Sequence, residues 1–271
     1  MAERELDGLT LSYGVHGTGG EPMLLIPPAA SRGSIWTRHQ VPALVAAGYV
    51  VVVPELRHTT SVGLPKPFGL FDLVSDVAAL ITALGLGPCR VAGASLGALI
   101  AQELAVARSE LVTALGLLGT RGRTDAYREA LGRGHAQAMR DGSRNTALFE
   151  ATSYMAQLFG PETLADDAFV GEWLTSYQLF RPGGAGAAAH YEATLGYDRL
   201  AELSSIRVPT LVISFGRDVI MPPAEGAAVA RAIPRARFVE LPGCGHFGFL
   251  ERPGEVNELL IDFFDGVERE P

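Results

Sequence analysis

The sequence is poor in cysteine and in positive charge. Its 271 residues include two cysteines, Cys89 and Cys244, which are too few for a disulfide framework or a cysteine-based metal site. We therefore expect two reduced thiols in or near the core. With 22 Lys and Arg against 30 Asp and Glu, the net charge is −8, which disfavours binding to DNA, RNA or an anionic membrane surface. We expect neither a nucleic acid nor a membrane as a partner.

Long apolar runs are missing as well. No stretch of about 18 apolar residues could span a bilayer, and residues 1–5 (MAERE) form no apolar signal core, so we expect a cytoplasmic protein. The chain contains no internal repeat, low-complexity tract or flexible linker, and no sequence signal for an oligomeric state. Hydrophobic residues nevertheless make up 48% of the chain and charged residues 19%, which is enough apolar material for a sizeable core.

Strand-like apolar runs alternate with helical segments in the first 118 residues and again after residue 205. The expected strands are 9–16, 22–26, 49–53, 90–94, 112–118, 208–214 and 237–241. The expected helices are 34–47, 73–84, 96–107 and 255–264. Alternation of this kind, with short glycine-rich turns, predicts an α/β fold with a mostly parallel twisted sheet and helices on both faces.

Residues 121–205 break this alternation. They contain no strand-like run, only four helical stretches, and they hold ten of the 21 aromatic residues of the chain. We expect residues 1–120 and 206–271 to form the α/β core and residues 121–205 to form a helical lid inserted over the sheet. Most lid aromatics would pack the helices together, and we select Trp173 and Tyr177 as candidates to line a substrate cavity.

Residues 90–100 (RVAGASLGALI) predict a buried strand, a tight turn at Ser95 and the start of a helix. The Gly-x-Ser-x-Gly pattern is typical of a nucleophile elbow, in which a strained turn lifts the serine hydroxyl above the sheet edge. Gly93 and Gly97 stand two residues to either side, where a side chain would collide with neighbouring backbone. The alternative is a glycine-rich strand-to-helix loop of an ordinary α/β protein.

An acid and a base follow two later strands. Asp218 comes shortly after the strand that ends at Ser214, and His246 lies in a glycine loop after the next strand. A serine becomes a good nucleophile when a base takes its proton and an acid orients that base. The order Ser95, Asp218, His246 matches one of the three known orders of such triads. The alternative is a turn-forming aspartate and a structural loop histidine.

With these motifs in the right order, the chain resembles α/β-hydrolase-fold proteins over nearly its whole length. It is similar to the lidded group that includes esterases, enol-lactone hydrolases, carbon–carbon bond hydrolases and cofactor-free haloperoxidases. The matching motifs are residues 93–97 (GASLG), 216–223 (GRDVIMPP), 243–246 (GCGH) and 251–253 (ERP). The resemblance implies that Ser95 is the nucleophile, His246 the general base and then acid, and Asp218 its orienting carboxylate. No metal or organic cofactor is implied.

The resemblance also implies an oxyanion hole made of two backbone N–H groups. One would come from Leu96, the residue after the nucleophile. The other would come from the loop after strand 22–26, which in the family usually begins His-Gly. This chain has Pro27 and Pro28 there, and proline has no N–H, so we expect Ala29 to be the second donor. The usual histidine commonly braces this loop, and proline stiffness is our expected substitute.

A second departure lies at residues 55–61 (ELRHTTS), where the family typically has Asp-x-Arg-Gly-His-Gly-x-Ser. The arginine is kept and both glycines are lost. Arg57 and His58 are therefore candidates to line the substrate site, and drift in a loop is the equally weighted alternative. For His135 and His190, which lie in the helical segment, we expect contact with solvent or substrate.

These observations lead to one hypothesis and two alternatives. The hypothesis is a serine hydrolase that cleaves an ester, lactone or thioester of a small, mostly apolar molecule through an acyl-enzyme on Ser95. The first alternative keeps the fold and performs acyl transfer, cyclisation or carbon–carbon cleavage in a biosynthetic route. The second is a non-catalytic ligand-binding protein on a hydrolase fold.

Overall fold

The computed structural model describes residues 2–6, 9–57, 67–142, 145–179 and 183–267. In these residues, eight strands form one sheet in the order β1-β2-β4-β3-β5-β6-β7-β8. The strands are β1 (Ala2–Leu6), β2 (Leu9–His16), β3 (Glu21–Ile26), β4 (Tyr49–Pro54), β5 (Cys89–Ala94), β6 (Val112–Leu118), β7 (Thr210–Phe215) and β8 (Ala236–Leu241). The pairs β1–β2 and β2–β4 are antiparallel, and the remaining pairs are parallel. The α/β fold class with a mostly parallel sheet is thus confirmed.

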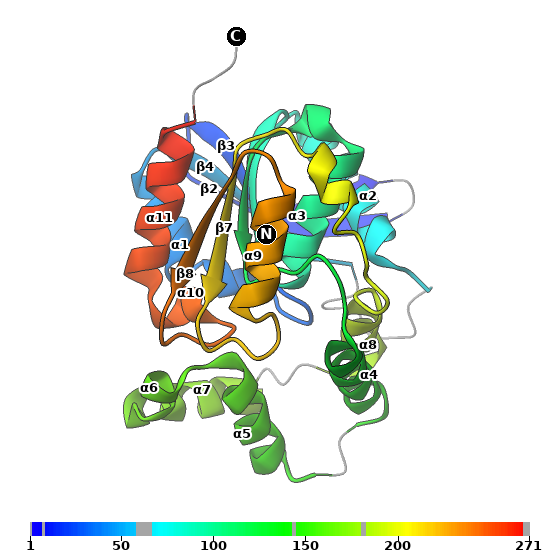
Figure 1. Cartoon of the computed structure of the whole chain (residues 1–271), viewed down its shortest axis with the longest axis vertical. Helices are drawn as coiled ribbons and strands as arrows, with labels where there is room; N and C mark the ends of the chain where they lie inside the picture. The colour runs from blue at the N-terminus through cyan, green and yellow to red at the C-terminus, as the bar shows by residue number, and fades with distance from the viewer. Residues whose placement is uncertain (1, 7–8, 58–66, 143–144, 180–182, 268–271) are drawn as a thin grey trace.

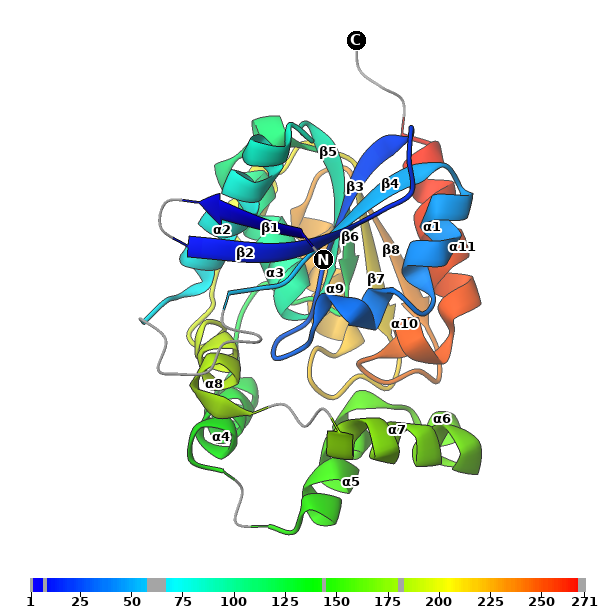
Figure 2. The same ribbon diagram turned by 180° about the vertical axis from the view of Figure 1, so that it is seen from behind.

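Helices cover both faces of the sheet (Figures 1 and 2). One face carries α2 (Leu70–Leu84), α3 (Leu96–Ala107) and α9 (Pro223–Ala232), and the other carries α1 (Gln40–Ala46) and α11 (Pro253–Asp265). Successive strand residues point to opposite faces, so Leu24 joins the first of these two cores and Leu25 the second. The continuous apolar runs of the central strands follow from this burial on both sides.

The segment between β6 and β7 contains helices α4 (Ala126–Asp141), α5 (Ala147–Leu158), α6 (Pro161–Leu164), α7 (Asp167–Leu179) and α8 (Gly184–Glu192). They lie beyond the carboxyl ends of the parallel strands and form two groups, α4 with α8 and α5 with α6 and α7 (Figures 1 and 2). The exact domain boundaries at residues 120 and 205 stay a prediction. No helix in the described ranges is long and apolar enough to cross a membrane.

Several expected elements differ from the structure. The helix expected at 34–47 is a 3-10 turn, Gly33–Trp36, followed by α1, whose first turn contains Pro42. In the insertion, where the sequence predicts four helical stretches (126–140, 146–159, 163–180 and 185–197), the third is divided into α6 and α7. The division arises because the Asp166 carboxylate accepts the N–H groups of Ala168 and Phe169 and so caps a new helix. The sequence did not predict β1, α9, the short α10 (Gly248–Glu251) or the 3-10 turns Ser109–Leu111 and Glu202–Ser205.

Candidate active site

Ser95 occupies a strained turn between β5 and α3. Its φ is +55°, in the left-handed region that few residues other than glycine adopt, and its N–H donates to the carbonyl of Leu118 at 3.0 Å. A Cβ on Gly93 would lie 2.3 Å from the carbonyl oxygen of Gly97, and one on Gly97 would lie 2.2 Å from that of Ile26. The expected close approach around the serine is therefore confirmed, and it requires both glycines.

Asp218 and His246 form a buried pair. Nδ1 of His246 lies 2.6 Å from Oδ2 of Asp218, and the two residues are each 3% exposed. The other carboxylate oxygen accepts the N–H groups of Ile220 and Met221 at 2.8 and 2.7 Å. Because a carboxylate only accepts, Nδ1 carries the proton and Nε2 of the neutral ring has a free lone pair. An imidazole oriented by a carboxylate in this way can act as a general base, and here the backbone fixes the carboxylate.

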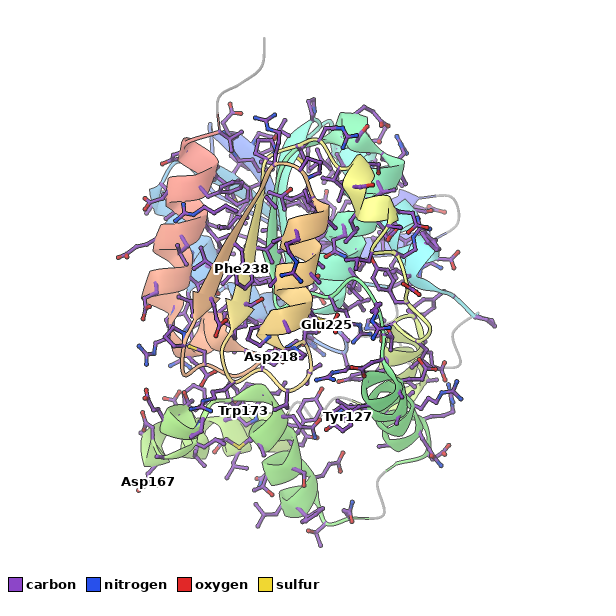
Figure 3. All side chains as sticks on the ribbon, in the orientation of Figure 1. Tyr127, Asp167, Trp173, Asp218, Glu225 and Phe238 are labelled. Carbon is purple, nitrogen blue, oxygen red and sulfur yellow. The ribbon has the colours of Figure 1, made fainter. Side chains whose placement is uncertain are left out.

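The end of β6 brings the serine and this pair together. Leu118 accepts the N–H of Ser95, and the next residue is Gly119, with φ +53°. A Cβ on Gly119 would lie 3.3 Å from Oδ2 of Asp218 and 3.5 Å from the His246 ring. All three predicted residues therefore meet at the carboxyl edge of the sheet. Figure 3 shows Asp218 at this edge, between the sheet and the helices of the insertion.

Two backbone N–H groups lie beside the elbow. Leu96 is the first residue of α3, so its N–H has no carbonyl one turn earlier to bond. A Cβ on Gly97 would meet the carbonyls of Ile26 and Pro27, so the start of α3 lies against the end of β3, just before Ala29. Within the described part of the chain, neither the N–H of Ala29 nor that of Leu96 has an acceptor. Both expected donors are therefore available at the same edge as Ser95.

The loop after β3 is a tight turn held by His190. Ser31 N–H donates to the carbonyl of Pro28 at 3.3 Å, and Ala30 between them has φ +53°. Ala30 N–H donates to Nδ1 of His190 at 3.1 Å, while Nε2 of His190 lies 2.8 Å from the carbonyl oxygen of Arg57. His190 is completely buried, so the expectation that it faces solvent or substrate is wrong. No local sequence pattern predicts this contact.

A cavity of about 700 Å³ lies between this loop and the helical insertion. It is lined by Ala30, Ser31, Arg32, Ser34, Ile35, Tyr154, Trp173, Ser176, Tyr177, Leu179, Gly183, Ala187 and Phe247. Ala30 adjoins Ala29, and Phe247 adjoins His246, so the cavity reaches the neighbourhood of the candidate catalytic groups. Trp173 and Tyr177 are among the lining residues, and their contact with a substrate stays a prediction.

A model of the alpha/beta hydrolase family matches residues 15–259. The chain belongs to this family. A protein from Mycobacterium tuberculosis named "Putative non-heme bromoperoxidase BpoC" is 36% identical over 261 residues, which cover 96% of this chain and 99% of that protein. The crystal structure of BpoC has a TM-score of 0.89 over 96% of this chain and 97% of that chain, at 35% identity.

Two further relatives of this alpha/beta hydrolase have names that refer to hydrolysis. "Putative carbamate hydrolase RutD" from Azorhizobium caulinodans is 26% identical over 96% of each chain. The structure of a thermophilic esterase from Thermogutta terrifontis has a TM-score of 0.82 at 27% identity, covering 96% of this chain and 94% of that one. These relatives support an enzyme of the alpha/beta hydrolase kind.

Two other candidate residues, Arg57 and His135, are not among the described residues that line the cavity. The guanidinium of Arg57 forms a two-bond ion pair with Asp76 and lies over the ring of Phe68. We expected Arg57 to line the substrate site, but its side chain is bound to these two residues instead. His58 lies outside the described residues. His135 stacks on the ring of Tyr191, and burial lowers the pKa of its imidazole.

Both cysteines match their expected role, because Cys89 and Cys244 are buried free thiols. Burial raises the pKa of the Cys244 thiol to about 11, which keeps it protonated at neutral pH.

Among the described residues, no cluster of three or more His, Cys, Asp or Glu side chains could hold a metal ion.

Proposed function

We propose that this protein is a serine hydrolase that cleaves an ester, lactone or thioester of a small, mostly apolar molecule. The observation that carries the proposal is the buried Asp218–His246 hydrogen bond at the sheet edge where Ser95 stands on its elbow. A serine, a base and an orienting acid in this arrangement are what acyl transfer to a hydroxyl requires. The esterase and hydrolase relatives agree with this class of reaction.

The proposed reaction uses these groups in two stages. Nε2 of His246 takes the proton of Ser95 as Oγ attacks the substrate carbonyl, and Asp218 stabilises the resulting imidazolium. The negative charge on the carbonyl oxygen is bound by the N–H groups of Ala29 and Leu96. His246 then gives its proton to the leaving oxygen or sulfur. In the second stage His246 activates a water molecule, which releases the acid from Ser95.

The cavity supports a small substrate with a mostly apolar surface. Its volume lies within the range of about 300–1,000 Å³ found for pockets that hold drug-sized ligands. Trp173, Tyr177 and Phe247 give it aromatic walls, and Arg32 is the charged residue among the described residues that line it. We propose that the helices between β6 and β7 act as the lid of this cavity and set substrate size.

A serine substitution tests the proposal. Ser95→Ala is expected to lower kcat for short p-nitrophenyl esters by about 10⁴-fold or more, since the loss of such a nucleophile costs up to about 10⁶-fold. Labelling by a fluorophosphonate probe should disappear with it. Ser75→Ala, on the exposed surface of α2, serves as the matched control. Ester hydrolysis that survives in a folded Ser95→Ala variant would refute the proposal.

The reaction class needs a second measurement. Turnover in H₂¹⁸O should place one ¹⁸O atom in the acid product if water resolves the acyl-enzyme. An unlabelled product would instead indicate acyl transfer or cyclisation. A wild-type protein that neither reacts with the fluorophosphonate nor turns over any ester would indicate a non-catalytic binding protein.

A further inference from the structure

His190 connects two loops that the sequence places far apart. It lies on α8 of the helical insertion, 160 residues from Ala30 and 133 residues from Arg57, and it is completely buried between them. We infer that His190 is the positioning residue of the oxyanion hole, holding the loop that presents the N–H of Ala29. This inference rests on the proposed function, because it assigns a role within the same site.

The contacts fix the ring in one neutral form. Ala30 N–H can only donate, so Nδ1 of His190 accepts and carries no proton. The proton is then on Nε2, which donates to the carbonyl of Arg57. Both nitrogens are satisfied, as a buried imidazole requires. The ring is therefore a rigid spacer of fixed length between the two backbones.

The turn needs such a support. Ala30 has φ +53°, a conformation that costs a residue with a Cβ about 1–2 kcal/mol. The Ser31 N–H bond to Pro28 closes the turn at a long 3.3 Å. The bond from Ala30 N–H to His190 fixes the peptide plane that directly follows Ala29, and the ring of Pro28 restricts the backbone before it. The direction of the Ala29 N–H is thus set from both sides.

The other end of the spacer is firmly anchored. Arg57 follows the end of β4 by three residues, and its side chain is held by Asp76 of α2. The ring of Phe68 also meets the His190 ring edge-on, with centroids 5.8 Å apart. A histidine from α8 therefore supplies the bracing that the Pro27–Pro28 sequence lacks. We expected the stiffness of Pro27 and Pro28 to replace the usual histidine of this loop. In the structure the N–H of Ala30 is bound by His190 instead.

Two isosteric substitutions separate the two bonds. In His190→Asn the amide oxygen lies near the former Nδ1. This variant can therefore accept the N–H of Ala30 but loses the hydrogen bond to the carbonyl of Arg57. In His190→Gln the amide nitrogen lies near the former Nε2, so it can donate to Arg57 and loses Ala30. Both variants lose one hydrogen bond and keep a buried amide. A purely structural role would therefore affect them alike.

The first readout is catalytic. With p-nitrophenyl acetate, kcat of His190→Gln should be at least about tenfold below that of His190→Asn, with KM similar in the two. The loss should stay below the roughly 10²–10³-fold cost of removing an oxyanion donor itself. Equal kcat values in two folded variants, or a lower value for His190→Asn, would overturn the inference.

The second readout does not depend on catalysis. Amide exchange measured by NMR should be slow for Ala30 in wild type and His190→Asn, and at least about tenfold faster in His190→Gln. Equal exchange in all three proteins would overturn the inference even if the enzyme is active. If the wild type proves inert towards esters and fluorophosphonate, the proposed function fails, and the catalytic role of His190 fails with it. The exchange rates then decide whether His190 holds this loop.

Discussion

The carboxylate of Glu251 joins the loop of His246 to the helical insertion, and its removal should weaken both. One oxygen accepts the N–H of Gly245 at 2.6 Å, and the other accepts the N–H of Gly160 at 2.8 Å and the hydroxyl of Thr163. The two backbones are in close contact here, since a Cβ on Gly160 would lie 2.0 Å from the carbonyl oxygen of Gly243. The carboxylate of Glu251 therefore joins two loops that already lie in contact.

The expected loss of stability follows from these three bonds. A hydrogen bond to a charged group contributes about 1.5–3 kcal/mol, and Glu251 is partly exposed, so water can replace some of the lost partners. We expect Glu251→Ala to lower the free energy of unfolding by about 3–5 kcal/mol. Glu251→Gln keeps one accepting oxygen and turns its NH₂ towards a backbone donor, which should cost about 2–3 kcal/mol.

Urea unfolding at neutral pH measures these differences, with Glu162→Gln as the control. Glu162 also pairs with a residue of this region, Arg252, but its side chain is 78% exposed, so its loss should cost under about 1 kcal/mol. Since Gly245 precedes His246, kcat of Glu251→Gln should fall by about tenfold as the base moves. A Glu251→Gln variant as stable and as active as Glu162→Gln would refute this account of the two loops.

Three further predictions concern other contacts. Gly97→Ala should lower the free energy of unfolding by about 3 kcal/mol or more, because the added Cβ meets a backbone carbonyl at 2.2 Å; thermal unfolding checks this, and a stable variant would contradict it. Burial raises the pKa of Glu55, whose Oε1 accepts the N–H of Gly33. A carboxyl whose pKa is higher in the folded state favours folding while it is protonated, and this contribution is lost as pH rises through the folded-state pKa. Glu55→Gln cannot titrate, so its free energy of unfolding, measured with urea at several pH values, should fall less steeply above about pH 4.3 than that of the wild type. Arg57→Ala should lower the free energy of unfolding by about 2–3 kcal/mol, because it breaks the partly buried ion pair with Asp76; a fully buried pair would cost about 3–5 kcal/mol. A loss of under about 0.5 kcal/mol, which is typical of an exposed pair, would contradict this prediction.

Much of the fold follows from the sequence because the central strands are buried on both faces. Their apolar runs, and the glycines that punctuate them, are local signals. The strand β1 (Ala2–Leu6) lacks such a signal, since its residues are mostly polar and it forms by pairing with β2 at the sheet edge. The split between α6 and α7 depends on a side-chain cap at Asp166, which a helical pattern alone does not reveal.

The candidate site likewise has residues whose meeting the sequence predicts and residues whose contacts it does not. Ser95, Asp218 and His246 each follow a strand, and parallel strands end at one edge of a sheet, so their meeting is predictable. The supports of the site are not predictable in this manner. His190 contacts backbone groups 133 and 160 residues away, and no spacing in the chain encodes them. Glu251 belongs to the motif at 251–253 and lies near Gly245, but its bond to Gly160 spans 91 residues and has no local signal.

The two groups of helices in the insertion are attached to different parts of the proposed machinery. His190 on α8 holds the loop that carries Ala29, one of the two proposed anion-binding N–H groups. Glu251 ties the α5–α6 junction to the loop of His246, the proposed base. The cavity between them has walls from both groups. An oversized acyl chain that wedges these walls apart would pull the base and the anion-binding groups away from each other. Such a substrate would bind well and react slowly, so selection by size would be expressed in kcat rather than in KM.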